Sequence, residues 1–159
     1  EAPFQPSPRE KRKYSDGQAL AVFRRDGFID RYSGTRLVFP GTLRLLSLYL
    51  PTEFPFHPNW HMAHTHFAYW LLCPTLDHLV PVVRGGVDAE VNWVTTSQLR
   101  NSAKGHWLLE ELGWQLHPPG RIEDWDGLLG WFLQQVQTDP SVASNPYVRQ
   151  WQRAAVKHA

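Results

Sequence analysis

The segment from 75 to 106 constrains the fold of this chain most, because its pattern is that of a hairpin followed by a helix. Short apolar stretches at 75–79 and 91–95 predict two strands, and the Gly-Gly pair between them favours a turn. Residues 96–106 predict a helix directly after the second strand. The segment therefore predicts a strand–strand–helix unit, which places the chain in the α+β class.

The composition is that of one globular domain. The chain has 159 residues, of which 42% are hydrophobic and 19% charged. Cys73 is the only cysteine, so an intrachain disulfide is excluded and a reducing compartment is favoured. The sequence has no run of about 18 apolar residues and no recognisable signal peptide. We therefore expect a cytoplasmic protein without a membrane partner.

Three parts are expected along the chain. Residues 1–14 predict an extended N-terminal arm, which is basic at 9–13. Residues 15–115 form the expected core, with an insertion at about 35–75, and 116–159 form a C-terminal helical extension packed on that core.

Four further helices are expected, at 17–25, 41–49, 122–136 and 146–157. Ser15 or Asp16 can cap the first helix, and Gly27 can end it. The third helix is predicted from apolar residues at i, i+3, i+4 and i+7 spacing, namely Trp125, Leu128, Leu129, Phe132 and Val136.

Polar residues in the hairpin and the helix supply the parts needed for phosphodiester hydrolysis. Asp77 at the end of the first strand and Asn101 in the helix can converge if the helix folds over the hairpin. Carboxylate and amide oxygens suit a hard cation such as Mg²⁺, which would stabilise charge on a phosphate. His78 projects from the opposite side of the pleat, and a histidine can activate water near neutral pH.

The order of these residues resembles the HNH, or ββα-metal, endonuclease family over about residues 24–106. The matching motifs are Asp-His-x-x-Pro at 77–81, Gly-Gly at 85–86, Asn92, and Asn-x-x-Lys-Gly at 101–105. The resemblance implies an α+β fold with a ββα-metal core and flanking helices. It also implies a metal-dependent endonuclease that hydrolyses phosphodiester bonds in DNA.

The resemblance also implies roles for four residues. His78 would be the general base, and Asn92 would brace the loop that holds it. Asp77 and Asn101 would be the ligands of one divalent cation, Mg²⁺ or Mn²⁺.

DNA is the expected partner, although the net charge of +1 neither requires nor excludes it. Arg84 and Lys104 are candidate phosphate contacts by the same resemblance. Arg24 and Arg25 form a local basic group that is either a solvated helix end or a further nucleic-acid contact. A family member that cuts duplex DNA at a palindrome would act as a homodimer.

The chain departs from the family at the positions of two zinc-binding Cys-x-x-Cys knuckles. Those positions are occupied by Asp30, Ser33, Ser97 and Arg100, so a structural zinc of the four-cysteine type is excluded. An ion pair between Asp30 and Arg100 is the expected substitute for the metal.

Alternatives stay open at this stage. His57, His61, His64 and His66 form either a second metal site or, as we favour, a structural and aromatic-stacking cluster. For the whole chain, the rival functions are a nucleic-acid-binding module that does not cleave and a domain whose aromatic surface binds a protein.

Overall fold

The computed structural model describes residues 14–158, so the predicted arm lies almost wholly outside the described part of the chain. In chain order the helices and strands are α1 (Asp16–Arg25), α2 (Pro40–Tyr49), α3 (Ala68–Leu72), β1 (Pro74–His78), β2 (Trp93–Ser97), α4 (Gln98–Lys104), α5 (Leu109–Leu112), α6 (Leu129–Thr138) and α7 (Pro146–Lys157). Short 3₁₀ turns lie at Met62–His64, Val82–Arg84, Glu90–Asn92 and Pro140–Ser144.

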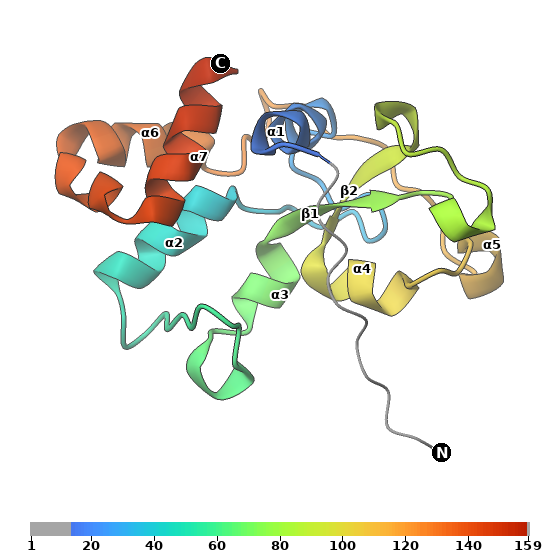
Figure 1. Ribbon diagram of the computed structural model, residues 1–159, viewed down its shortest axis with the longest axis horizontal. Helices are drawn as coiled ribbons and strands as arrows, with labels where there is room; N and C mark the ends of the chain where they lie inside the picture. Colours follow the sequence, from blue (N-terminus) through green and yellow to red (C-terminus); the bar gives the residue numbers. More distant parts are fainter. Residues whose placement is uncertain (1–13, 159) are drawn as a thin grey trace.

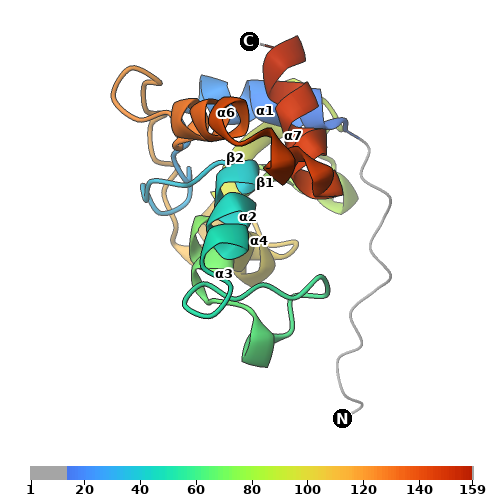
Figure 2. The ribbon, with the colours of Figure 1, turned by 90° about the vertical axis from the view of Figure 1, so that its left-hand side faces the viewer.

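The two strands form an antiparallel hairpin in which Pro74 pairs with Ser97 and His78 pairs with Trp93. Helices α1 and α4 lie on opposite faces of this hairpin, while α2, α6 and α7 form a helical layer beside it (Figures 1 and 2). The α+β class expected from the sequence is therefore confirmed.

Helix α1 begins where its capping residues predict. The Ser15 hydroxyl accepts the Gln18 backbone N–H, and the Gln18 side chain accepts the Ser15 backbone N–H. This capping box satisfies backbone donors that a helix start leaves unpaired. Beyond the helix, Gly27 adopts a positive φ of 64°, a conformation that favours glycine.

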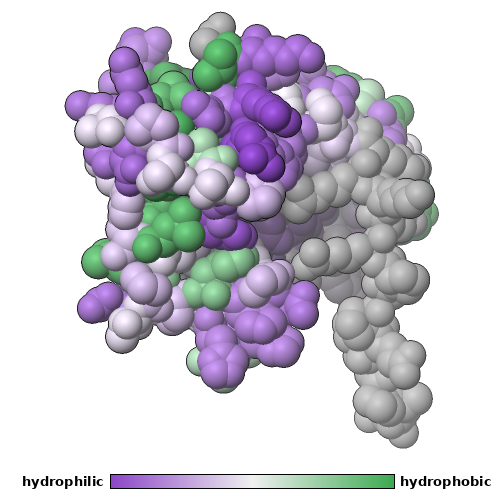
Figure 3. Space-filling model, turned by 60° about the vertical axis from the view of Figure 1, so that its left-hand side comes forward, coloured by the Kyte–Doolittle hydropathy of each residue, from purple (hydrophilic) through white to green (hydrophobic). Residues whose placement is uncertain are grey.

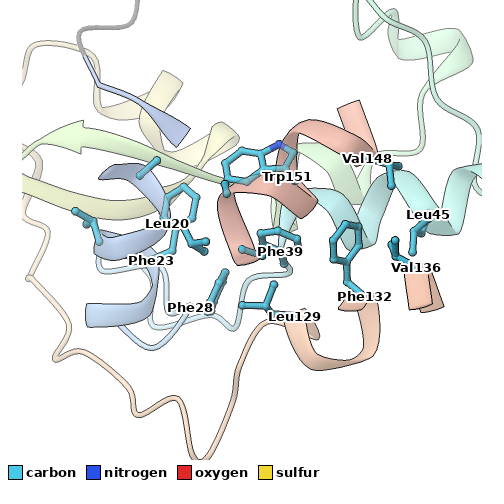
Figure 4. Close-up of a cluster of buried hydrophobic side chains, with 14 of the residues drawn as sticks. Leu20, Phe23, Phe28, Phe39, Leu45, Leu129, Phe132, Val136, Val148 and Trp151 are labelled. Atoms are coloured by element: carbon cyan, nitrogen blue, oxygen red, sulfur yellow. The ribbon is translucent and has the colours of Figure 1, made fainter. Parts of the chain in front are cut away.

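A continuous apolar core joins α1, the helical layer and the inner face of the hairpin. Phe39 lies at its centre, with ring centroids 5.0 Å from Phe132 and 5.4 Å from Trp151 (Figure 4). Helix α7 packs against both α1 and α2 through this cluster. The side of the molecule shown in Figure 3 is largely hydrophilic, with hydrophobic residues in small separate patches.

Two buried carboxylates fix the segment after α1 to strand β2. Asp26 accepts the Thr95 backbone N–H and forms ion pairs with Arg25 at 3.0 Å and Arg31 at 2.8 Å. Asp30 accepts hydrogen bonds from the Thr96 hydroxyl and from the backbone N–H groups of residues 32 and 97. Buried carboxylates of this kind are stable only when fully bonded, so the two aspartates set where β2 lies.

The prediction of a helix at 122–136 is wrong in its first half. Gly127 and Leu128 have positive φ values of 68° and 63°, so the chain turns there and α6 begins at Leu129. Asp126 stabilises this turn by accepting the N–H groups of Leu128 and Gly130. Trp125 lies before the helix and donates its indole N–H to Leu37.

The ends of the ββα unit also differ from the sequence-based bounds. Strand β2 begins two residues later than expected because the chain makes a 3₁₀ turn at Glu90–Asn92. Helix α4 begins after Ser97, whose hydroxyl accepts the Arg100 N–H, and it ends at Gly105. The short helices α3 and α5 were not predicted.

Replacement of Asp26 by alanine is expected to lower the free energy of unfolding by about 3 kcal/mol, because it leaves Arg25, Arg31 and the Thr95 N–H without their buried acceptor. Urea unfolding would measure the change. Glu123→Ala is the control, since its pair with Arg121 is exposed and 3.7 Å long, and it should cost less than about 0.5 kcal/mol. Equal effects of the two substitutions would contradict the anchoring role.

Candidate functional site

Asp77 lies on the face of β1 that is turned toward α4. Its Oδ2 accepts a hydrogen bond of 2.7 Å from the Tyr32 hydroxyl and lies 3.0 Å from Lys104 Nζ. Burial, followed by the charge of Asp77, raises the pKa of the Tyr32 phenol. Tyr32 therefore stays protonated and acts as a fixed donor that orients the carboxylate.

Lys104 is fully buried between α4 and the hairpin. Its ammonium also donates a 3.0 Å hydrogen bond to the carbonyl of His78, so it joins the helix to the end of β1. A lysine is rarely buried unless it is paired, and here Asp77 supplies the partner. As placed, Lys104 presents no surface to a phosphate.

Asn101 is three residues before Lys104 on α4, so the two side chains lie on neighbouring parts of one helix face. It forms part of the wall of a cleft that also includes Thr75. Thr75 lies on the same strand face as Asp77, two residues away, but Asp77 itself does not line this cleft, and no hydrogen bond within residues 14–158 joins it to Asn101.

Asp77 and Asn101 carry oxygen atoms of the kind that a hard divalent cation binds. Within residues 14–158, the Asn101 side chain and Asp77 Oδ1 make no hydrogen bond or ion pair, so one amide oxygen and one carboxylate oxygen are available. A hard cation that keeps most of its waters accepts such a donor pair. The ammonium of Lys104 weakens the attraction of Asp77 for a cation, because it already pairs with Oδ2 of this carboxylate. A cation bound by Asp77 would therefore have to use Oδ1.

His78 forms a polar pair with Asp88, which lies in the loop between the strands. His78 Nε2 is 2.8 Å from Asp88 Oδ1, and the Trp93 indole N–H reaches the same oxygen at 3.3 Å. An ionised carboxylate only accepts hydrogen bonds, so in a neutral imidazole this contact places the proton on Nε2 and leaves Nδ1 as the acceptor. About a third of the His78 side chain is exposed, at 31%, which leaves the ring accessible to solvent.

The loop from 79 to 91 is held by the side chain of Asn92. Its Oδ1 accepts the Val80 N–H at 3.0 Å, and its Nδ2 donates to the carbonyls of Val80 at 2.8 Å and Val87 at 2.9 Å. Asn92 is itself buried. Asn92 lies in the 3₁₀ turn just before β2, next to Trp93, which pairs with His78.

Glycine is required at positions 85 and 86 of the loop for two different physical reasons. Gly85 has a positive φ of 94°, which a residue with a side chain adopts only with strain. At Gly86, any Cβ would overlap the carbonyl oxygen of Val80. Glycine at both positions lets the chain fold tightly against Asn92.

The three arginines expected to contact nucleic acid each have partners within the protein. Arg84 pairs with Glu111 at 2.6 Å, and Arg24 donates to the carbonyl of His158. Arg25 bonds Asp26 and the carbonyls of residues 90 and 93. Arg84 is the most exposed of these partnered groups, with 40% of its side chain accessible.

The expected ion pair between Asp30 and Arg100 is wrong, since the ion pairs within residues 14–158 do not include it. Asp30 is buried and bonds to β2, where Thr96 and Ser97 supply its donors. The Arg100 guanidinium lies over the ring of Trp114 instead, 5.6 Å from its centroid.

In the 57–66 segment His57 lies against His61 and near His64, whose ring is tilted at a centroid distance of 6.2 Å, while His66 lies apart from them against an aromatic ring. The rings of His57 and His61 lie 4.2 Å apart and nearly parallel, and His66 stacks on Phe54 at 4.7 Å. Partial desolvation, then the charges of His61 and His64, lower the pKa of His57. Across the described part of the chain, no group of three or more histidine, cysteine, aspartate or glutamate side chains is arranged to hold a metal ion.

Two residues of this site were not identified from the sequence, namely Tyr32 and Asp88. Tyr32 is 45 residues from Asp77, so no local pattern connects them. Asp88 carried a weak signal, since it is an acidic residue in a loop that must return beside His78.

Comparison with known proteins gives no assignment for the chain. No protein-family model, no curated protein and no solved structure matches it. No helix of the described region is both long enough and apolar enough to cross a membrane. The contacts within the chain are therefore the only basis for a proposed function.

Substitution of Asn92 by alanine is expected to lower the free energy of unfolding by about 2–3 kcal/mol, because three loop hydrogen bonds are lost together. Amide exchange at Val80 should accelerate in the same variant. Asn59→Ala, at an exposed position, serves as the control and should change neither quantity. Slow exchange at Val80 in the Asn92 variant would contradict the bracing role.

Proposed function

We propose that this chain is a metal-dependent endonuclease of the HNH type, which hydrolyses phosphodiester bonds in DNA. The observation that carries the proposal is the pair formed by His78 and Asp88, beside a loop that Asn92 holds in place. The hairpin followed by α4 supports it further, since this is the element order that the resemblance implies.

In this proposal His78 removes a proton from water. Asp88 fixes the tautomer and ring orientation, so that Nδ1 can accept the proton. Asp77 and Asn101 would hold a divalent cation, Mg²⁺ or Mn²⁺, which supplies positive charge to the scissile phosphate when bound. Tyr32 keeps the Asp77 carboxylate in a fixed orientation through its hydrogen bond.

DNA is the proposed partner, and Arg84 is the candidate contact with the most accessible charge. If Arg84 released Glu111 and bound a phosphate, its guanidinium would make a charge-assisted hydrogen bond both before and after DNA binding. Action as a homodimer at a palindromic site stays a prediction.

One observation favours a second candidate function, a DNA-binding module without cleavage. Lys104 already neutralises Asp77 from within the protein, which weakens the attraction of that carboxylate for a cation. In such a module the polar residues of the hairpin would be structural.

Incubation with supercoiled plasmid distinguishes the two functions. We expect the wild-type chain to nick or linearise the plasmid with Mg²⁺ or Mn²⁺ and to leave it intact with EDTA. His78→Ala should lower the rate roughly 100-fold or more, because the general base is lost. The control His158→Ala removes an exposed histidine near the C-terminus and should cut at the wild-type rate.

Plasmid that stays intact with every metal, while still being retarded in a gel by the protein, would favour the binding module. Cleavage that survives in the His78 variant would remove the proposed base and with it the mechanism.

A further inference from the structure

A second candidate site is a cleft of about 710 Å³, bounded by α2 and α7 on one side and by the start of β1 and α4 on the other. Its wall is rich in aromatic rings, and Arg44 of α2 is the one charged residue among the described residues that line it. His78, Asp88 and Asn92 do not line this cleft. It is therefore a separate feature from the catalytic pair.

The guanidinium of Arg44 is held between two aromatic rings. Its Cζ lies 3.5 Å from the ring centroid of Phe56 and 4.4 Å from that of Tyr147. Within residues 14–158 it forms no ion pair, and its buried Nε has no hydrogen-bond partner. Burial accordingly lowers the pKa of Arg44. The cleft thus contains a rigidly positioned positive charge that no carboxylate balances.

The ring of Trp151 also forms part of the wall of the cleft. Trp151 is only 4% exposed, and its indole N–H is buried without an acceptor, out of reach of a molecule in the cleft. The ring nitrogen lies on the edge that faces away from Phe39 and the centre of the core (Figure 4). What the cleft offers a ligand is therefore its aromatic rings and the accessible part of the Arg44 guanidinium, which no carboxylate pairs within residues 14–158.

We propose that this cleft binds a nucleotide, with its phosphate on Arg44 and its base against the aromatic rings. A guanidinium matches the geometry of a phosphate, and aromatic side chains stack on bases of any sequence. The rings of Trp60 and Tyr69, whose centroids are 5.5 Å apart, belong to the same wall. The volume lies within the range of roughly 300–1,000 Å³ that small-molecule sites occupy.

The location of the cleft connects it to the proposed nuclease. Asn101, the candidate metal ligand on α4, forms part of its wall. If the proposed function holds, the bound nucleotide is an unpaired nucleotide of the DNA strand next to the cut. This step rests on the proposed function, whereas binding of a nucleotide in the cleft does not.

Quenching of tryptophan fluorescence tests the proposal, because Trp60 and Trp151 both line the cleft. Deoxyadenosine monophosphate, deoxyadenosine, inorganic phosphate and a single-stranded oligo-dA would be titrated separately in EDTA, so that no cleavage contributes. We expect the monophosphate to bind at least about tenfold more tightly than the nucleoside or the phosphate alone. Tighter binding of oligo-dA would identify the nucleotide as part of a strand.

The variants assign the binding to named groups. Arg44→Gln should weaken monophosphate binding at least about tenfold. Trp60→Leu should also weaken it, because a ring in the wall of the cleft is lost. Arg153→Gln removes the same charge from an exposed position of α7 and should bind as the wild type does. Circular dichroism would confirm that each variant is folded, and Trp60→Leu is the test if Arg44→Gln does not fold.

Equal binding of nucleoside and monophosphate, equal binding of inorganic phosphate, or an unchanged affinity in the tested cleft variants would overturn the nucleotide site. A protein that cuts plasmid but fails to bind the monophosphate would also overturn it, and the nuclease proposal would stand. A protein that binds the monophosphate but never cuts would leave the cleft assigned and the nuclease rejected.

Discussion

The site depends on the hydrogen bond and the ion pair that the buried ammonium of Lys104 makes. This ammonium lies between α4 and β1, where it bonds the carbonyl of His78 and the carboxylate of Asp77. A buried lysine without these partners would be strongly destabilising, so the helix and the strand end must keep their relative positions. The same contact occupies Oδ2 of Asp77 and leaves Oδ1 as the carboxylate oxygen that a cation would have to use.

The strand end separates two kinds of polar group. Asp77 faces α4, where Tyr32 and Lys104 orient it, whereas His78 lies on the other side of the pleat and reaches Asp88 in the loop. The Asp77 carboxylate and the His78 imidazole therefore have separate side-chain partners on opposite faces of the strand. Asn92 stabilises the position of Asp88, because its side chain is hydrogen-bonded to the loop that contains Asp88.

Local patterns predicted much of this fold from the sequence. The cap at Ser15, the ββα order and the last helix at 146–157 all depend on nearby residues, and all are present. The helix at 122–136 failed because an apolar spacing does not reveal the left-handed backbone at Leu128. Tyr32 was missed because it is 45 residues from Asp77 and meets it only in the folded chain, whereas Asp88 carried only the weak signal of an acidic residue in the hairpin loop.

The proposed function requires that Asp77 and Asn101 bind one divalent cation beside Lys104. Anomalous diffraction from crystals grown with Mn²⁺ would locate that cation. We expect a manganese peak in contact with an Asp77 carboxylate oxygen and the Asn101 amide oxygen, and its loss in Asp77→Asn. A manganese ion bound elsewhere, or none between these two residues at saturating Mn²⁺, would show that they are not the metal site.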